Sequence, residues 1–142
     1  MSNIDTILTR KGSSYITVGP DSTVLEALQL MADQNVGSVV VQDAEKYHGI
    51  FTERNYSRNV ILKNRHSSNT KVRDVMSVDL PVLNTQDSLT HCMQLMADHN
   101  LRYLPVMDQE EMMGIISITD VIREKVIDQK EVIRHLKEYI QG

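Results

Sequence analysis

The sequence predicts a mixed α/β (α+β) fold built from two copies of one βαββα-type unit. Three observations support this: an internal repeat, an amphipathic helical stripe in each copy, and two short apolar strands after each stripe. Gln29–Asn35 recurs as Gln94–Asn100, 65 residues later, and 12 of 41 positions are identical between 18–58 and 83–123 without a gap. Because repeats this short usually bury their apolar faces against each other, we expect two mutually dependent units.

The first element of each copy is expected to be a short strand. Tyr15–Val18 is rich in β-branched and aromatic residues, and Gly19-Pro20-Asp21 after it is typical of a turn. Leu80–Leu83 takes the same place in the second copy and is followed by Asn84.

An amphipathic helix comes next in each copy, because apolar residues recur at the spacing of one helix face. The first stripe comprises Val24, Ala27, Leu28, Met31 and Ala32, and the second comprises Leu89, Cys92, Met93, Met96 and Ala97. Ser22, Thr23 and Asp87 are suitable N-caps, and Thr23 with Glu26 has capping-box spacing. Burial of the second stripe makes Cys92 a core residue rather than a nucleophile.

A strand pair and a second helix complete each copy, with Gly49-Ile50 matching Gly114-Ile115. The strands are expected at Ser38–Gln42, Tyr47–Thr52, Arg102–Met107 and Met112–Ser117, and the helices at Glu53–Lys63 and from Ile118 onward. Ile4–Leu8 and Val72–Met76 are expected to begin the two copies. We therefore place the first repeat at 4–63, a polar linker at 64–71, the second repeat at 72–127 and a C-terminal helical extension at 128–142. Helices should lie outside two small sheets related by pseudo-two-fold symmetry.

The composition limits the functional classes. The formal net charge of −4 disfavours a nucleic-acid binder, which needs a basic surface. No apolar run approaches the ~20 residues of a membrane span, and the N-terminus lacks the features of a signal peptide. We expect a cytoplasmic protein with neither nucleic-acid nor membrane partners.

The residues also argue against catalysis and metal binding. Cys92 is the single cysteine, and the five histidines show no ligand spacing. No Ser/His/Asp set or Walker-type glycine loop is visible. We expect a protein that is not an enzyme and that requires no cofactor.

The segment that carries most chemistry is Gly114–Arg123, a strand end followed by a helix start. A helix N-terminus has unpaired N–H groups and partial positive charge, so it suits a phosphate. Ser117 and Thr119 offer hydroxyls, Asp120 offers a carboxylate for the two hydroxyls of a ribose, and Arg123 offers a guanidinium. Ser117 and Asp120 also have the spacing of a plain capping box, which needs no ligand. The same residues can serve both roles.

Three sequence motifs resemble signatures of the cystathionine-β-synthase (CBS) domain family. They are Gly-Ile-Ile-Ser-Ile-Thr-Asp at 114–120, Leu-Arg-Tyr-Leu-Pro-Val at 101–106 and Gly-Ile-Phe-Thr-Glu-Arg at 49–54. Their order and duplication resemble a stand-alone tandem CBS-domain pair. The resemblance implies a non-catalytic, energy-sensing regulatory module that binds AMP, ADP, ATP, NAD(H) or S-adenosylmethionine in a cleft between the repeats.

The resemblance also assigns a candidate site, residue by residue. The hydroxyls correspond to Ser117 and Thr119, the ribose-binding aspartate to Asp120, and a basic residue near the phosphate to Arg102. The base-contacting strand of the opposite repeat corresponds to Tyr15, Ile16 and Thr17, and the entry to the hairpin corresponds to Val36 and Gly37. One competent site would therefore take its base contacts from the first copy and its sugar-phosphate contacts from the second.

The symmetry-related site departs from this pattern. Thr52 and Arg54 are present, but Asn55 stands where the family has aspartate. An amide offers one neutral acceptor oxygen, and hydrogen bonds to charged groups contribute ~1.5–3 kcal/mol against ~0.5–1.5 kcal/mol for neutral ones. We expect a site that binds roughly ten-fold more weakly, is empty or prefers another ligand. Arg54 could compensate at a phosphate.

The C-terminal extension carries an a/d seam, formed by Ile122, Val126, Ile133, Leu136 and Ile140 and broken by Gln129. The seam predicts either a long helix that packs on its own domain or a subunit contact in a homodimer. A regulated partner protein is expected but not identified. The alternative to a nucleotide sensor is a structural dimerisation module whose sites are empty or degenerate, which the substitution at Asn55 favours.

Overall fold

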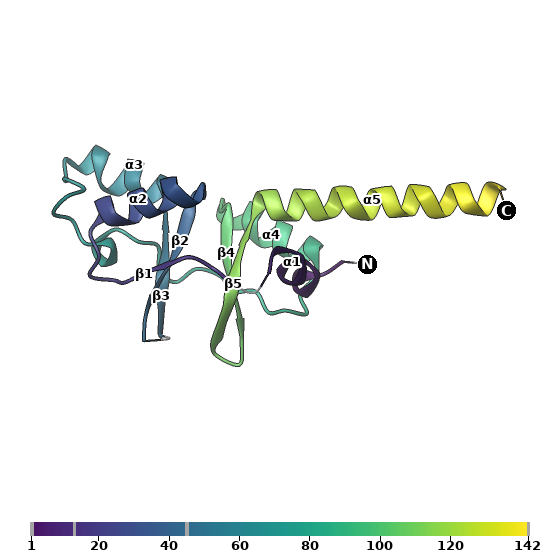
Figure 1. The fold of residues 1–142 in the computed structure, drawn as a ribbon, viewed down its shortest axis with the longest axis horizontal. Helices are drawn as coiled ribbons and strands as arrows, with labels where there is room; N and C mark the ends of the chain where they lie inside the picture. Colours follow the sequence, from purple (N-terminus) through teal and green to yellow (C-terminus); the bar gives the residue numbers. More distant parts are fainter. Residues whose placement is uncertain (1, 13, 45, 142) are drawn as a thin grey trace. The chain divides into compact units, whose positions relative to one another are not determined.

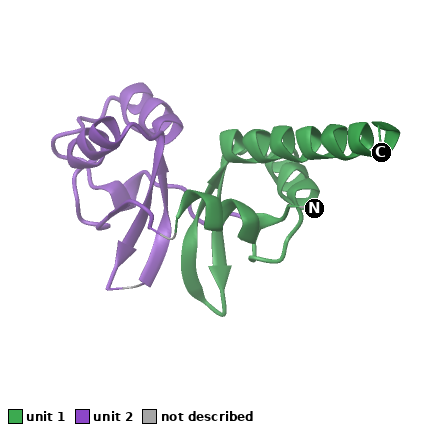
Figure 2. Ribbon diagram, turned by 45° about the vertical axis from the view of Figure 1, so that its right-hand side comes forward, with its two compact units in different colours: residues 1–13, 81–142 green, residues 14–80 purple. Residues whose placement is uncertain are grey.

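The computed structural model describes residues 2–12, 14–44 and 46–141, and the chain divides into two compact units (Figure 2). Residues 14–80 form what we call the first-repeat unit. Residues 1–13 and 81–142 form the second-repeat unit. Each unit contains an antiparallel hairpin with one helix before it and one after it (Figure 1). The predicted α/β class with two βαββα-type copies is therefore confirmed.

The first-repeat unit is built on a three-stranded sheet with the order β1-β2-β3. Its elements are β1 (Thr17–Val18), α2 (Val24–Gln34), β2 (Ser38–Asp43), β3 (Lys46–Thr52), α3 (Glu53–Asn59) and the 3-10 helices η1 (Ile61–Lys63) and η2 (Val72–Asp74). Strand β1 pairs with β2 in parallel, with Thr17 opposite Val40. Strand β2 pairs with β3 in antiparallel register, with Ser38 opposite Thr52.

The second-repeat unit repeats this plan around a two-stranded sheet. Its elements are α1 (Ile4–Lys11), α4 (Leu89–His99), β4 (Tyr103–Asp108), β5 (Glu111–Ser117) and α5 (Ile118–Gln141). The pairing of β4 with β5 places Tyr103 opposite Ser117. In each unit the hairpin therefore ends at the residue that caps the next helix.

The amphipathic helices α2 and α4 bury the expected stripes. Val24, Ala27 and Met31 are buried in α2, and Leu89, Cys92 and Met96 are buried in α4, whereas Ala32, Met93 and Ala97 at the margins of the stripes are exposed. The hydroxyl of Thr23 accepts a hydrogen bond from the Glu26 N–H at 3.1 Å and caps α2 as predicted. Helix α4 is capped by Ser88, which accepts from the His91 N–H at 3.0 Å, and not by Asp87. The carboxylate of Asp87 instead accepts from the Asn84 N–H at 2.9 Å.

Three predicted elements are shorter or absent in the structure. The first strand covers Thr17–Val18 rather than Tyr15–Val18. Leu80–Leu83 forms no strand, since only Leu83 pairs, in an isolated parallel bridge with Val106. Pro81 lacks an N–H, so this segment cannot supply the full row of donors that a ladder needs. Helix α3 ends at Asn59 rather than Lys63, because the φ of Val60, −113°, departs from the regular helical value and the chain continues as η1.

The compact units and the sequence repeats differ at their leading segments. Helix α1, which begins the first repeat, contributes Ile4 and Ile7 to the core of the second-repeat unit. The equivalent segment at the start of the second repeat contributes Val72 and Val75 to the core of the first-repeat unit. Each unit therefore takes its leading segment from the other repeat.

The repeated glycines explain how these exchanged segments fit. A Cβ atom at Gly49 would collide with the carbonyl oxygen of Ser77, and one at Gly114 would lie 3.0 Å from the side chain of Leu8. The backbone of Ser77 also pairs with Ile50, through hydrogen bonds of 2.9 and 3.1 Å. The duplicated glycine thus gives the leading segment room to approach the last strand of each hairpin.

Helix α5 is far longer than its counterpart α3. Its first turns pack on the second-repeat unit through Val121 and Glu124, which are buried. From Gln129 to Gln141 every described residue is exposed, and the seam residues Ile122, Val126, Ile133, Leu136 and Ile140 are 43–79% exposed. The seam therefore does not pack on its own domain. Gly142, the last residue of the predicted extension, lies outside the described residues.

Candidate functional site

The start of α5 is where most of the predicted site residues meet. Ser117 ends β5 and caps α5, with its hydroxyl accepting from the Asp120 N–H at 3.1 Å. The Oδ2 atom of Asp120 accepts in return from the Ser117 N–H at 2.9 Å. This reciprocal pair is the capping box that the spacing predicted. Thr119 lies between the two residues and is exposed.

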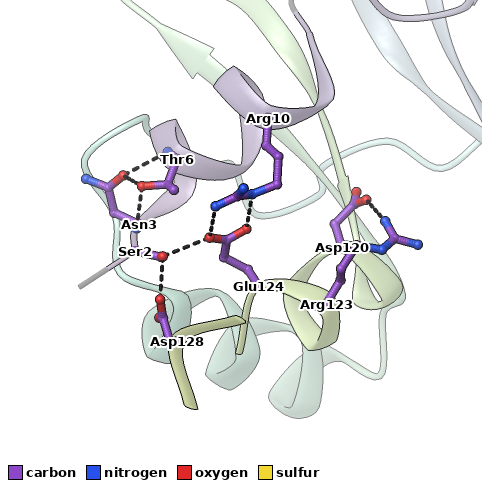
Figure 3. A network of polar contacts seen from close by, with 8 residues as sticks. All are labelled: Ser2, Asn3, Thr6, Arg10, Asp120, Arg123, Glu124 and Asp128. Carbon is purple, nitrogen blue, oxygen red and sulfur yellow. Dashed lines mark hydrogen bonds and ion pairs between the residues drawn. The ribbon is translucent and has the colours of Figure 1, made fainter. Parts of the chain in front are cut away.

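Asp120 is a nearly buried carboxylate with two cations beside it. Its side chain is 9% exposed, and Lys11 Nζ lies 2.8 Å from Oδ2. Arg123, one turn further along α5, places Nη1 3.7 Å from Oδ1, and Figure 3 shows its guanidinium turned toward the carboxylate. The partial positive charge of the helix N-terminus acts in the same direction. The carboxylate is therefore fixed in orientation, and its charge is compensated by the two neighbouring cations.

Arg102 contacts the start of α5 through its backbone. Its carbonyl oxygen accepts from the Ile118 N–H at 2.9 Å, which joins the entry to β4 with the first turn of α5. Its side chain is exposed. The structure thus brings together Arg102, Ser117, Thr119, Asp120 and Arg123 within the second-repeat unit.

The other predicted contacts belong to the first-repeat unit. The Tyr15 hydroxyl donates to Gln42 Oε1 at 2.9 Å, and the Ile16 carbonyl accepts from the Val40 N–H at 3.0 Å, so both are tied to β2. Thr17 lies on β1 and is exposed. A site that joins these residues to Asp120 remains a prediction from the family resemblance.

Val36 and Gly37 lie at the entry to β2 in the first-repeat unit. The Val36 N–H donates to the Met31 carbonyl at 3.0 Å, and the Gly37 carbonyl accepts from the Glu53 N–H at 3.2 Å. Gly37 therefore has the same position relative to α3 that Arg102 has relative to α5, because each carbonyl accepts from the first N–H of its helix. The first-repeat unit has no side chain where the second-repeat unit has a guanidinium.

The second candidate site, at the start of α3, repeats the geometry with neutral groups. The Thr52 hydroxyl accepts from the Asn55 N–H at 3.1 Å, and Asn55 Oδ1 accepts from the Thr52 N–H at 2.9 Å. Asn55 is buried, and its amide donates to the Ser77 hydroxyl at 3.0 Å. Arg54 follows Thr52 by two residues and is half-buried. The two hydrogen bonds of the capping box are preserved here, but Asn55 lacks the negative charge that Asp120 carries at the start of α5.

Sequence reasoning missed Lys11, the cation closest to Asp120. Lys11 also donates to the Ile115 carbonyl at 2.9 Å, so it contacts both the strand and the helix of the site. No local spacing predicts this contact, because Lys11 lies 109 residues before Asp120. The contact depends on α1 packing in the second-repeat unit.

A second buried carboxylate, also missed, fixes α1 against α5 (Figure 3). Glu124 is 2% exposed and accepts two hydrogen bonds from the Arg10 guanidinium, at 2.9 and 3.0 Å. Ser2 donates to the same carboxylate at 2.8 Å. The hydrogen bond and charge of Arg10 lower the pKa of Glu124, against the opposing effect of its burial. This network fixes the position of Arg10, which immediately precedes Lys11 in the chain.

The remaining features considered from the sequence are the cysteine, metal ligands and membrane-spanning segments. Cys92 is fully buried, and its burial raises the pKa of the thiol to about 11, so the predicted core role is confirmed. Within the described residues no three His, Cys, Asp or Glu side chains are grouped so as to hold a metal ion. Among those residues, no helix is both long and apolar enough to cross a membrane.

Comparison with known proteins agrees with this architecture. The family model described as "CBS domain" matches twice, at residues 6–61 and 72–127. The chain is 35% identical over 150 residues to the mitochondrial CBS domain-containing protein CBSX3 of Arabidopsis thaliana, a match covering 99% of this chain and 73% of that protein. It is 34% identical over 121 residues to the CBS domain-containing protein YhcV of Bacillus subtilis, covering 85% and 84% of the two chains. A solved CBS-domain containing protein from Agrobacterium tumefaciens superposes with a TM-score of 0.82 at 31% identity, covering 87% of this chain and 99% of that one.

Proposed function

This chain belongs to the CBS-domain family, and from that premise we propose that it is a regulatory module that binds an adenine nucleotide. The proposed ligands are AMP, ADP, ATP and NAD(H), bound by groups from both repeats. The module itself catalyses no reaction. It reports the ligand to a partner protein that remains to be identified.

The observation that carries this proposal is the state of the Asp120 carboxylate. Oδ2 is used by the Ser117 N–H and by Lys11, whereas among the described contacts Oδ1 faces only Arg123, at 3.7 Å. That distance is too long for a hydrogen bond. Oδ1 is therefore the oxygen that can accept from a ribose hydroxyl, and the capping box already fixes its direction.

The groups around Asp120 suit the rest of a sugar-phosphate. Ser117, which caps α5, and Thr119, in the first turn of α5, both supply hydroxyls. The first N–H groups of a helix and its partial positive charge favour an anion. Arg102 and Arg123 add two exposed guanidinium groups, which bind phosphate oxygens in pairs.

The base contacts are assigned to the first repeat by family resemblance. Among the described strands, β1 lies at the edge of its sheet, so its outer backbone groups are open to the hydrogen-bonding edge of a purine. Ile16 and Val36 are half-buried apolar residues that suit the face of an aromatic ring. Tyr15, Thr17 and Gly37 complete this proposed set.

The site at Asn55 is proposed to be the weaker of the two. Its amide holds the same capping position but already donates to Ser77, and it offers no charge to a ribose hydroxyl. The difference between a charged and a neutral hydrogen bond corresponds to roughly ten-fold in affinity. One nucleotide per chain is therefore the expected stoichiometry at moderate concentration.

Isothermal titration calorimetry with AMP, ADP, ATP, NADH and S-adenosylmethionine tests the proposal. Asp120→Asn is the sharpest variant, because Asn55 shows that an amide preserves the capping box in this fold. We expect this variant to weaken the best ligand by about ten-fold or more. Asp33→Asn, at an exposed aspartate of α2, serves as the matched control and should leave affinity unchanged. An unaltered affinity in Asp120→Asn would refute the assigned site.

A second candidate function is a structural dimerisation module without a ligand. The exposed apolar seam of α5 and the neutral site at Asn55 favour it. The chain contains no Trp, so bound nucleotide should be conspicuous as absorbance near 260 nm in freshly purified protein. Co-purified nucleotide would exclude this alternative. A clean protein spectrum, combined with no heat in any titration, would favour it.

A further inference from the structure

Lys11 connects three parts of the second-repeat unit at a single point. It is the last residue of α1, and its Nζ donates to the Asp120 carboxylate at 2.8 Å and to the Ile115 carbonyl at 2.9 Å. An ammonium group carries three donors, and these two contacts leave one unused. The side chain is 36% exposed, and none of the contacts described for Lys11 uses the third N–H.

The charge of the site makes this third donor important. A carboxylate that binds the ribose of a nucleotide also lies near the phosphates of the same molecule, and the two like charges repel each other. Lys11 cancels the charge of Asp120 through direct contact, and Arg123 adds a second positive charge at 3.7 Å. The three side chains together carry one net positive charge, which is the sign that an anionic ligand requires.

The first-repeat unit provides an internal comparison. There the residue equivalent to Asp120 in the capping box is Asn55, which is neutral, and its partner is Ser77, also neutral, at 3.0 Å. The lysine therefore occurs where the aspartate occurs, and both are missing together at the other helix start. The presence of Lys11 therefore follows the charge of Asp120. It does not follow from packing, because the two units pack alike and only one of them has the lysine.

The position of Lys11 is fixed independently of Asp120. Ile4 and Ile7 anchor α1 in the core, and Arg10 is paired with the buried Glu124 (Figure 3). The C-terminal end of a helix also stabilises a cation. Lys11 is thus held beside the N-terminus of α5 before any ligand binds. Contact with a phosphate would therefore cost little conformational entropy.

From these observations we infer that Lys11 determines ligand specificity, by neutralising Asp120 and donating its remaining N–H to a phosphate oxygen. This inference rests on the proposed function and deepens it. It assigns to Lys11 the preference for phosphorylated over unphosphorylated nucleosides. Asp120 itself contributes to both classes, because both carry the ribose.

The test compares AMP with adenosine by calorimetry, at constant ionic strength, in the full chain and its variants. Lys11→Met keeps the aliphatic stem and removes the charge. We expect it to weaken AMP by about ten-fold or more and adenosine by less than about three-fold, since only AMP carries the anion. Lys11→Arg should retain the preference for AMP. Lys71→Met removes a lysine that pairs with the exposed Asp21 at 3.5 Å and should change neither affinity.

Each other outcome overturns the inference. Equal losses for AMP and adenosine would mean that Lys11 only positions Asp120, and no loss for either would mean that it does not contribute. If the wild-type chain binds no nucleotide, the proposed function itself fails and the inference fails with it. Thermal unfolding of each variant checks the fold, and Lys11→Gln, which keeps a donor but not the charge, replaces Lys11→Met if the latter is unfolded.

Discussion

The buried carboxylate of Glu124 offers the sharpest prediction about stability. We consider the substitution Glu124→Gln, which keeps the shape of the side chain and one acceptor oxygen. In the wild-type chain the carboxylate accepts two hydrogen bonds from Arg10 and one from Ser2 while only 2% exposed. The amide group of the variant would turn a donor toward the donors of Arg10, so at least one of these contacts is lost.

The magnitude follows from the burial of the two partners. A hydrogen bond to a charged group contributes about 1.5–3 kcal/mol, and its loss is partly offset where water can replace it. The guanidinium is half exposed and can be rehydrated, whereas Glu124 is enclosed. We therefore expect Glu124→Gln to lower the free energy of unfolding by about 1–2 kcal/mol. For a chain of this size the melting temperature should fall by about 3–8 °C.

The loss should also depend on pH. Arg10 lowers the pKa of Glu124 in the folded chain. A carboxylate with a lowered folded pKa stabilises the fold above its unfolded pKa, and this contribution disappears as the pH falls through the folded value. The difference between wild type and Glu124→Gln should be complete at pH 7 and shrink once the pH drops below the ordinary value of 4.5.

Urea unfolding at pH 7 and at pH 4, followed by circular dichroism, measures this difference. Glu138→Gln on the same helix is the matched control, because Glu138 is 68% exposed and lies 4.0 Å from Arg134. Exposed pairs of this kind contribute at most about 0.5 kcal/mol. A loss in Glu124→Gln that is no larger than in the control, or that is equal at both pH values, would show that the network does not stabilise α1 on α5.

Two further predictions concern the fold and the assembly. Gly49→Ala should destabilise the first-repeat unit by about 1–3 kcal/mol, because its Cβ would collide with the Ser77 carbonyl. Gly19→Ala, with only an ordinary contact, should be nearly neutral in the same thermal melts. Leu136→Glu should convert a dimer into a monomer in light scattering, because Leu136 lies mid-seam on α5 and is 56% exposed in the single chain. Glu131→Gln, outside the seam, should stay dimeric, and a monomeric wild-type chain would contradict the proposed contact.

The sequence predicts those parts of the fold that depend on local periodicity. The stripes of α2 and α4 follow from the spacing of Val24 to Met31 and of Leu89 to Met96, because burial on one helix face imposes that spacing. The capping box at the start of α5 is equally local, since its partners lie three residues apart. These features require no knowledge of which segments pack together.

The contacts that depend on distant segments could not be predicted in this way. Lys11 and Asp120 are 109 residues apart, and nothing in either neighbourhood indicates that α1 packs beside α5. The Arg10–Glu124 pair escapes prediction for the same reason, since each residue alone resembles a solvated charge on a helix. The sequence therefore indicates Asp120 and Arg123 as candidate site residues but not Lys11, the cation in direct contact with the carboxylate.

The exchanged leading segments make each repeat dependent on the other for a complete core. A solitary copy of the repeat would have no foreign segment to complete its core, because Ile4 and Ile7 serve one unit and Val72 and Val75 the other. Two separate copies of the repeat could meet this need by exchanging their N-terminal segments, as the two repeats of this chain do. The repeat at an offset of 65 residues indicates that this chain contains two such copies in tandem. Severing the chain between residues 63 and 72 should accordingly yield halves that fold only when mixed.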